Sequence, residues 1–142
     1  MSKDGIDAIA ICSLREAMIF ASILSKMSIP AIHSAAALLK LCQITFNGSN
    51  VLFIRAILAK KYSLPRRVIV ALIEYFQSFM EETRALPVLW HQALLIFTQY
   101  YKTALDENQI ETVRAIIKTL KHHLISIEIR RELDSLRYIT KT

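Results

Sequence analysis

Four basic side chains flank a short proline-containing segment in the middle of the chain: Lys60, Lys61, Arg66 and Arg67. Between them, Ser63 and Pro65 resemble the cap and the first turn of a helix, where proline costs little because its missing N–H would have no partner there. The N–H groups at a helix start, flanked by four cations, favour binding of a phosphate group. The segment therefore predicts a contact with an RNA backbone or with an acidic segment of a partner protein.

The charges at both ends of the expected helix oppose its dipole. Arg66 and Arg67 lie at the positive end of the expected helix, which is unfavourable by ~0.3–1 kcal/mol each, and Glu81 and Glu82 at its far end also oppose the dipole. Two exceptions in one helix indicate a functional compromise. The alternative is that Lys60 and Lys61 only complement the end of the preceding helix and that both arginines are solvated.

The positive charge of the chain is confined to one block of sequence. Between Ala17 and Ile73 there is no Asp or Glu, but there are seven basic residues: Lys26, Lys40, Arg55, Lys60, Lys61, Arg66 and Arg67. The remainder carries eleven basic and twelve acidic residues, so this block accounts for the whole net charge of +6. Uncompensated charge of one sign favours an anionic partner, with RNA the commonest, and it adds Lys40 and Arg55 to the candidate contact residues. A surface that only keeps the protein soluble is the alternative.

No pattern in the chain predicts catalysis or metal binding. The two glycines stand alone at positions 5 and 48, so there is no glycine-rich phosphate loop. His122 and His123 are adjacent and project about a third of a turn apart, which makes a poor metal pair. Cys12 and Cys42 are far apart and are expected to be buried free thiols in a reducing compartment. We expect a non-enzyme without cofactor, metal or small-molecule substrate.

Helical periodicity runs nearly from end to end, and strand alternation is missing. We expect one all-α domain over residues 1–142 with about seven helices, at 6–27, 31–45, 50–61, 64–83, 87–104, 107–123 and 127–137. Pro30, Pro65 and Pro87 each stand where a helix begins, and residues 47–50 supply a turn and a cap. Helix pairs that begin near residues 31, 64 and 107 are typical of helical-hairpin repeats, as in HEAT-like proteins. This favours an irregular α-solenoid, with a globular helical bundle as the alternative.

Charges in the last third of the chain have local explanations. Asp106 and Gln109 have the spacing of a capping box, and Ser126 is placed to cap the last helix. Arg130 is expected to pair with Asp134, and Arg131 with Glu128. Lys118 and Lys121 belong to a basic helix end, which the dipole favours.

A membrane span is not expected, because Asp7, Arg15 and Glu16 interrupt the most apolar early stretch.

The segment from Leu86 to Lys102 contains the only tryptophan. On a helical wheel Trp90 shares an apolar arc with Phe97 and Tyr101, and Pro87 precedes them, so we expect these four residues to mark a structural core rather than a binding site. His91, Gln92, Thr98 and Gln99 lie on the opposite, polar arc, and His91 is expected at the surface.

The same segment, Leu86-Pro87-Val88-Leu89-Trp90-His91-Gln92 and its continuation, resembles the signature helix of the bystin family of small-subunit ribosome assembly factors. Three more segments resemble the family in the same order: residues 32–41, residues 53–68, which include Lys60-Lys61-Tyr62-Ser63-Leu64-Pro65-Arg66-Arg67, and residues 128–133. Members of that family are longer and carry a charge-rich N-terminal region. The sequence is compatible with an excised C-terminal domain and equally with a reduced member.

The resemblance implies a scaffold without chemistry of its own on precursors of the small (40S) ribosomal subunit. It implies a role in 18S rRNA maturation, binding to pre-rRNA, small-subunit ribosomal proteins and assembly factors, and a location in the nucleus and nucleolus, with late particles also cytoplasmic. A mean hydropathy of +0.35 is high for a soluble monomer and keeps an alternative open. In that alternative, the chain is a helical adaptor that binds a partner peptide or helix in an apolar groove without RNA contact.

Overall fold

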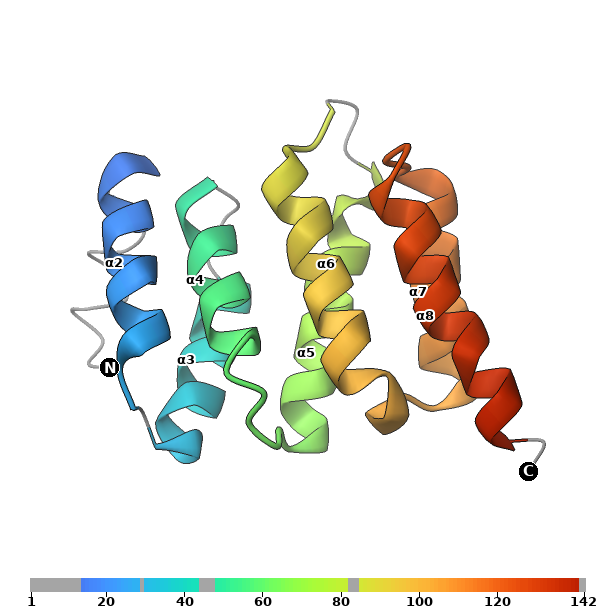
Figure 1. Ribbon diagram of the computed structural model, residues 1–142, viewed down its shortest axis with the longest axis horizontal. Helices are drawn as coiled ribbons and strands as arrows, with labels where there is room; N and C mark the ends of the chain where they lie inside the picture. The colour runs from blue at the N-terminus through green and yellow to red at the C-terminus, as the bar shows by residue number, and fades with distance from the viewer. Residues whose placement is uncertain (1–13, 29, 44–47, 82–84, 141–142) are drawn as a thin grey trace. The chain divides into compact units, whose positions relative to one another are not determined.

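The computed structural model describes residues 14–28, 30–43, 48–81 and 85–140, and every regular element in these ranges is helical (Figure 1). The all-α prediction is confirmed. The chain divides into two compact units, Met1–Leu72 (unit 1) and Ile73–Thr142 (unit 2). The boundary between the two units falls inside the helix Arg66–Gln77. The prediction of one domain, and the choice between a solenoid and a bundle, stay predictions.

Unit 1 contains α2 (Leu14–Lys26), α3 (Ala31–Gln43), α4 (Gly48–Leu58) and the first part of α5 (Arg66–Gln77). The helix α4 packs against both α2 and α3, and Figure 1 shows α2 and α4 side by side. From Asn50 to Leu58 every side chain of α4 except that of Arg55 is buried, as expected of a helix enclosed by others. On α3 the buried stripe follows the i, i+4, i+7 spacing of Ser34, Leu38 and Leu41.

One buried amide links two helices of unit 1. Asn50, at 0% exposure, donates from Nδ2 to the carbonyl oxygen of Leu41 at 3.4 Å. A buried amide is costly unless it is hydrogen-bonded, so this contact favours one register between α3 and α4. The turn predicted at residues 47–50 is corrected in part: Gly48 already begins α4 and Asn50 lies inside the helix, while Asn47 lies outside the described residues.

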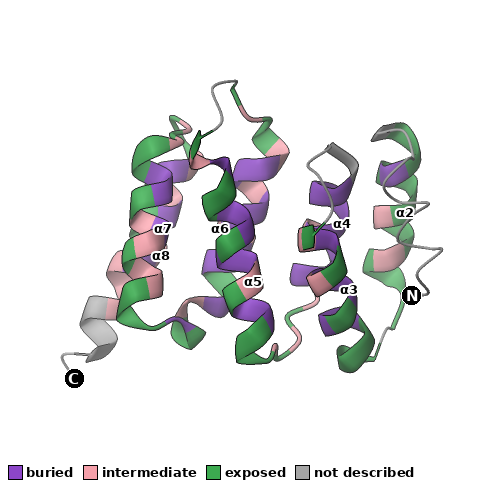
Figure 2. Ribbon diagram, turned by 180° about the vertical axis from the view of Figure 1, so that it is seen from behind, coloured by how far each residue is buried: buried purple, intermediate pink, exposed green. Residues whose placement is uncertain are grey.

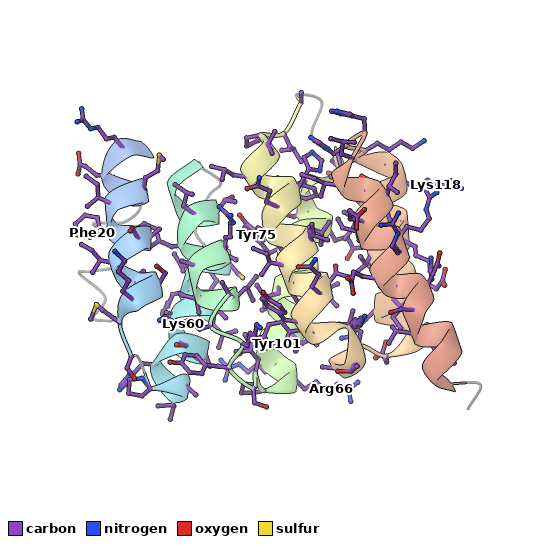
Figure 3. The ribbon with its side chains drawn as sticks, viewed as in Figure 1. Phe20, Lys60, Arg66, Tyr75, Tyr101 and Lys118 are labelled. Carbon is purple, nitrogen blue, oxygen red and sulfur yellow. The ribbon has the colours of Figure 1, made fainter. Side chains whose placement is uncertain are left out.

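The helix α2 leaves a large apolar face uncovered. Met18, Ile19, Phe20 and Ile23 are all exposed, whereas Ala17 is fully buried. In Figure 2 most of the α2 ribbon has the green of exposed residues, and Figure 3 shows Phe20 pointing away from α4. Within the described part of unit 1, α2 therefore packs through a narrow strip that includes a small side chain, which lets α4 approach closely.

Unit 2 contains the rest of α5 and, in the described residues, five further elements in chain order. They are the 3₁₀ helix η1 (Ser78–Glu81), α6 (Val88–Tyr101) with the 3₁₀ turn η2 (Lys102–Ala104), α7 (Glu107–Thr119) and α8 (Ile125–Thr140). Its core is aromatic: the ring of Trp90 meets those of Phe76 and Phe79 edge-on, at centroid distances of 5.7 and 5.8 Å. Such edge-to-face pairs are the preferred aromatic geometry.

Helix starts match the sequence better than helix ends. Pro30, Pro65 and Pro87 each stand directly before a helix, and their carbonyl oxygens accept N–H groups of the first turn. The capping box is confirmed: Asp106 Oδ1 accepts from the N–H of Gln109 at 2.8 Å, and Gln109 Oε1 accepts from the N–H of Asp106 at 2.9 Å. The starts of α3, α5, α6 and α7 thus lie within two residues of the predicted positions.

Most helix ends come earlier than predicted, whereas α8 runs to Thr140, three residues past its predicted end. The helix predicted to reach residue 83 ends at Gln77 and continues as the 3₁₀ helix η1, so Glu81 is not at the end of an α-helix and its supposed conflict with the dipole of α5 disappears. Glu82 and residues 6–13 lie outside the described residues. Apolar periodicity continues through η1 because Phe79 is buried in the core, and this continuity hid the change of helix type.

Candidate nucleic-acid interface

Five cations of unit 1 belong to segments that meet at one end of its helices. Because α2, α3, α4 and α5 run alternately up and down, the end of α2, the end of α4 and the start of α5 lie at the same end of unit 1 (Figure 1). Figure 3 shows Lys60 and Arg66 toward this end. We call this surface the basic end; it consists of Lys26, Lys60, Lys61, Arg66 and Arg67.

Lys60 joins two helices at the basic end. Its Nζ donates a hydrogen bond to the carbonyl oxygen of Met27, directly after α2. The carbonyl end of a helix carries partial negative charge, so an ammonium group there is favourable. Lys60 therefore complements the end of α2, a helix that the alternative, which named only the preceding helix α4, did not include. Its side chain is half-buried, and part of its charge is already used inside unit 1.

Lys61 has a backbone conformation that usually belongs to glycine. Its φ is 61°, in the left-handed region, and its N–H donates to the carbonyl oxygen of Leu58 at 3.1 Å, at the end of α4. A non-glycine residue costs about 1–2 kcal/mol in this conformation. This left-handed conformation lets the chain turn between α4 and α5, and the side chain at the turn is an exposed cation.

Arg66 and Arg67 are the first two residues of α5, and both are exposed. The carbonyl oxygen of Pro65 accepts from Val68 and Ile69, at 3.0 and 3.2 Å. Pro65 therefore precedes the helix, as a cap residue does, and not Ser63. The N–H groups of a first turn have no acceptor inside their helix, and here two guanidinium groups accompany them. This pairing of arginines with a positive helix end, inferred from the sequence, is present.

Two of the six predicted contact residues do not belong to the basic end. Lys40 is exposed but lies nine residues after the start of α3, about 14 Å along the helix from that end. Arg55 is half-buried within α4, among residues that form the core of unit 1. The reason is topological: the chain runs along each helix, so basic residues that are close in sequence can lie at opposite ends of the same helix. Lys26 belongs to the basic end instead. The sequence could have indicated this, because in an up-and-down order of helices the end of the first helix lies beside the end of the third.

Charge is divided unequally between the two units. Unit 1 spans nine basic and three acidic residues, and unit 2 spans nine of each. The net +6 therefore belongs entirely to unit 1. In unit 2, opposite charges pair with each other. Lys102 Nζ lies 2.8 Å from Glu132 Oε2 on another helix, and Arg131 Nη1 lies 2.8 Å from Glu128 Oε1 on the same helix. The predicted Glu128–Arg131 pair is confirmed.

The other predicted ion pair is wrong. Asp134 Oδ1 lies 3.0 Å from Nη2 of Arg114 on α7, and not against Arg130 on its own helix. Arg114 also approaches Glu111, at 3.8 Å. A contact between helices that the packing already brings together needs less ordering of long side chains than an exposed pair within one helix. Arg130 remains exposed.

The tryptophan segment is a core element on more faces than predicted. Trp90 and Phe97 are fully buried and Tyr101 nearly so, while Pro87 is exposed and stands before the first turn of α6. Burial raises the pKa of Tyr101 to about 12, so it stays a neutral phenol. The expected surface position of His91 is wrong, because only 5% of this residue is exposed. Thr98 of the supposed polar arc is also buried, and its Oγ1 donates to the carbonyl oxygen of Leu94 at 2.8 Å.

Three histidine rings of unit 2 lie in series, with His122 stacked on His123 and tilted by 51° to the ring of His91. The His122 ring lies 5.3 Å from that of His91 and 4.6 Å from that of His123, between centroids. Burial, and then the nearby His122, lower the pKa of His91. His122 Nδ1 accepts from the N–H groups of Leu124 and Ile125, and Ser126 Oγ accepts from the N–H of His122. The start of α8 is thus closed by His122 together with Ser126, where Ser126 alone was predicted.

Within the part of the chain that the structure describes, no group of three or more His, Cys, Asp or Glu side chains is arranged to hold a metal ion. Cys42 is a free thiol, and burial raises its pKa to about 12; Cys12 lies outside the described residues. None of the described helices combines the length and the apolar character that crossing a membrane requires.

Comparison with known proteins gives a consistent result. The family model described as Bystin matches residues 8–141. The chain is similar to Bystin of Dictyostelium discoideum, with 51% identity over 123 residues, and to Bystin of Homo sapiens, with 48% identity over 124 residues. These alignments cover 86% and 87% of the chain but only 26% and 28% of the two relatives, so the chain spans about a quarter of their length. On the family match and these identities, the chain belongs to the bystin family.

Proposed function

We propose that this chain is a non-enzymatic assembly factor that contacts precursors of the small ribosomal subunit. In this role it supports 18S rRNA maturation as a scaffold, through contacts to pre-rRNA and to ribosomal and assembly proteins. It acts in the nucleus and nucleolus and accompanies late particles into the cytoplasm. Membership of the bystin family supports the proposal, together with the assembly role that the sequence resemblance implies.

The observation that carries the RNA contact is the basic end. Five cations from three segments of unit 1 meet there, and unit 1 holds the whole net charge of the chain. Helix-start N–H groups beside arginine side chains suit a phosphodiester, because both recognise its oxygens and neither depends on base sequence. The proposed contact is therefore with the RNA backbone, and it positions the scaffold without reading a sequence.

The strained backbone at Lys61 is a second reason to propose that the basic end contacts RNA. Glycine would adopt the left-handed conformation without cost, yet a lysine occupies the position and is exposed. An outlier of this kind is a reason to look for a role of its side chain. A phosphate contact by this ammonium group is the role we propose.

Salt-dependent RNA binding tests the proposal. The variant combines Lys61→Gly, which removes a cation and suits the local backbone, with Arg66→Gln and Arg67→Gln. Lys60 stays, because it holds the end of α2. The affinity for a single-stranded RNA should fall, and the slope of log K against log salt should decrease by about 2, since each phosphate contact contributes roughly 0.7 for single strands. Filter binding at several salt concentrations measures both quantities.

The matched control removes equal charge from unit 2 through Lys118→Gln, Lys121→Gln and Arg130→Gln. Circular dichroism checks that both variants keep their helix content. If the control lowers RNA affinity and slope as much as the basic-end variant does, binding follows net charge alone and the basic end has no special part in it. If neither variant changes RNA binding, the proposed contact is wrong.

A second candidate function is a protein-binding adaptor without RNA contact. The exposed apolar side chains of α2, with Phe20 at 51% and Ile19 at 56% exposure, favour it. Binding through such a face depends on apolar area and is much less sensitive to salt than phosphate binding. A partner whose binding is lost in Phe20→Ser and does not change with salt would favour the adaptor over the RNA scaffold.

A further inference from the structure

A cleft on unit 2 gathers cations from two helices. It has a volume of about 530 Å³ and is lined by Glu111, Arg114, Ala115, Ile117, Lys118, Lys121 and Arg130. The first five belong to α7, Lys121 lies two residues after it and Arg130 belongs to α8, and these two helices pack against each other. Figure 3 shows Lys118 projecting away from the helices. The lining thus holds four basic side chains and one acidic side chain.

Three of the cations follow one another along α7 and just past its end. Arg114 and Lys118 have the spacing i, i+4, so they lie on one face of the helix, and Lys121 stands two residues after the helix ends. Of the four cations, Arg114 is neutralised by Asp134 and Glu111. Lys118, Lys121 and Arg130 take part in no ion pair with the described residues. Like charges at these spacings repel each other, and an anionic ligand would relieve that repulsion.

Local helix electrostatics explain only part of this cluster. Lys118 and Lys121 lie near the end of α7, where cations are favourable. Arg130 has no such reason, because it lies in the second turn of α8, nearer the positive end of that helix. Its expected partner, Asp134, is held by Arg114 at 3.0 Å. Because Asp134 pairs with Arg114, it does not pair with Arg130, and the guanidinium group of Arg130 lies at the cleft.

We propose that this cleft binds an acidic segment of a partner protein, with Asp or Glu side chains on the three unpaired cations. The apolar part of the lining favours a peptide over RNA, because the exposed Ala115 offers a contact for an aliphatic side chain; Ile117 also borders the cleft, with 3% of the residue exposed. None of the described residues that line the cleft has an aromatic ring, whereas single-stranded RNA is usually bound through bases stacked on such rings. The site goes beyond the proposed RNA contact, since it belongs to the neutral unit and takes a different partner.

Calorimetric titration of the whole chain with a short synthetic peptide rich in Glu and Leu tests this inference. Its counterpart with Gln in place of every Glu should bind at least about tenfold more weakly. The variant Lys118→Gln with Arg130→Gln should lower the affinity for the acidic peptide by a similar factor, because both side chains are exposed and their ligand contacts are lost. Lys26→Gln with Lys40→Gln removes equal charge from unit 1 and should change the affinity by less than about twofold.

A gain-of-affinity variant separates recognition from damage to the fold. Glu111→Gln removes the acidic side chain of the lining, so the acidic peptide should bind more tightly, and a misfolded protein would not show this result. Equal binding of the Gln peptide would overturn the proposal, as would unchanged affinity of the Lys118/Arg130 variant. Loss of RNA affinity but not of peptide affinity in that variant would assign the cleft to RNA. None of these results depends on whether the basic end of unit 1 binds RNA.

Discussion

Burial keeps His91 neutral in the core of unit 2. Its ring lies edge-on against Trp90 at 5.0 Å and faces His122 at 5.3 Å, between centroids. The pKa of His91 is lowered by burial and by the nearby His122. A proton on this ring would be desolvated and would repel any charge on its neighbour, so protonation disfavours the folded state.

The sign of the pH dependence follows from this shift. Above its ordinary pKa of 6.5, His91 is neutral in both the folded and the unfolded chain, and its environment costs nothing. As the pH falls below 6.5 toward the lowered pKa, the unfolded chain binds the proton first and stability is lost.

Urea unfolding at about pH 7.5 and about pH 5.5 should therefore give a smaller free energy of unfolding at the lower pH. In His91→Gln this difference should shrink, because the titrating group is gone. The exposed His33 offers the control, and His33→Gln should keep the pH dependence of the original chain. A His91→Gln protein with the same pH dependence as the original chain would show that other groups cause it.

At the scale of elements, one ammonium group holds the end of α2. The Nζ of Lys60 contacts the carbonyl oxygen of Met27, thirty-three residues earlier in the chain. This contact brings the end of α4 to the end of α2, in a unit where α2 packs through a narrow face. The contact is partly exposed, so its contribution is that of a helix end-cap rather than that of a core residue.

Lys60→Met should loosen the last turn of α2 while leaving α4 folded. We expect a loss of roughly 0.3–1 kcal/mol, the usual size of a cation at a helix carbonyl end. Hydrogen exchange measures the effect locally: the amides near Met27 should exchange faster, and those of the α4 core should not. Lys61→Met removes an equal charge from the next position and should leave exchange near Met27 unchanged. Equal acceleration in both variants would mean that general charge, and not this contact, protects the turn.

The elements also show how far sequence patterns reach. Capping chemistry is local, so Asp106 with Gln109 and the three prolines placed helix starts correctly. Helix faces depend on neighbours that are distant in sequence. A helical wheel assigned His91 and Thr98 to a polar face, but packing encloses them, and the wheel had no information on how many helices surround α6. The change from α5 to η1 at Ser78 was missed for a related reason, since buried aromatic residues continue through it.

The candidate site shows the same limit. Sequence order grouped Lys61, Arg66 and Arg67, and the structure places these three residues at one turn between two helices. It also grouped Lys40 and Arg55 with them, which the structure places away from that turn, because counting charges along the chain ignores the direction of each helix. The α7–α8 cleft was missed because Arg130 had a plausible partner four residues away, and only packing shows that Asp134 pairs with Arg114.

At the scale of the whole molecule, charge divides the chain into a cationic unit 1 and a neutral unit 2. This division predicts where RNA crosslinks form. Ultraviolet crosslinking to a single-stranded RNA, followed by mass spectrometry, should give peptides that surround the turn from Lys60 to Arg67. Unit 2 should give few, although both units contain aromatic residues. Crosslinks concentrated on α7 and α8 would contradict the assignment of RNA to the basic end and of acidic protein to the cleft.

The single tryptophan has a practical consequence. Trp90 is fully buried in unit 2, and its indole N–H has no hydrogen-bond acceptor among the described residues. An indole in such apolar surroundings emits at short wavelength and shifts to the red when water reaches it. Intrinsic emission thus reports on unit 2 alone, while far-ultraviolet dichroism reports on every helix. Recording both during one denaturant titration reveals whether the cationic and neutral parts melt together, without any attached dye.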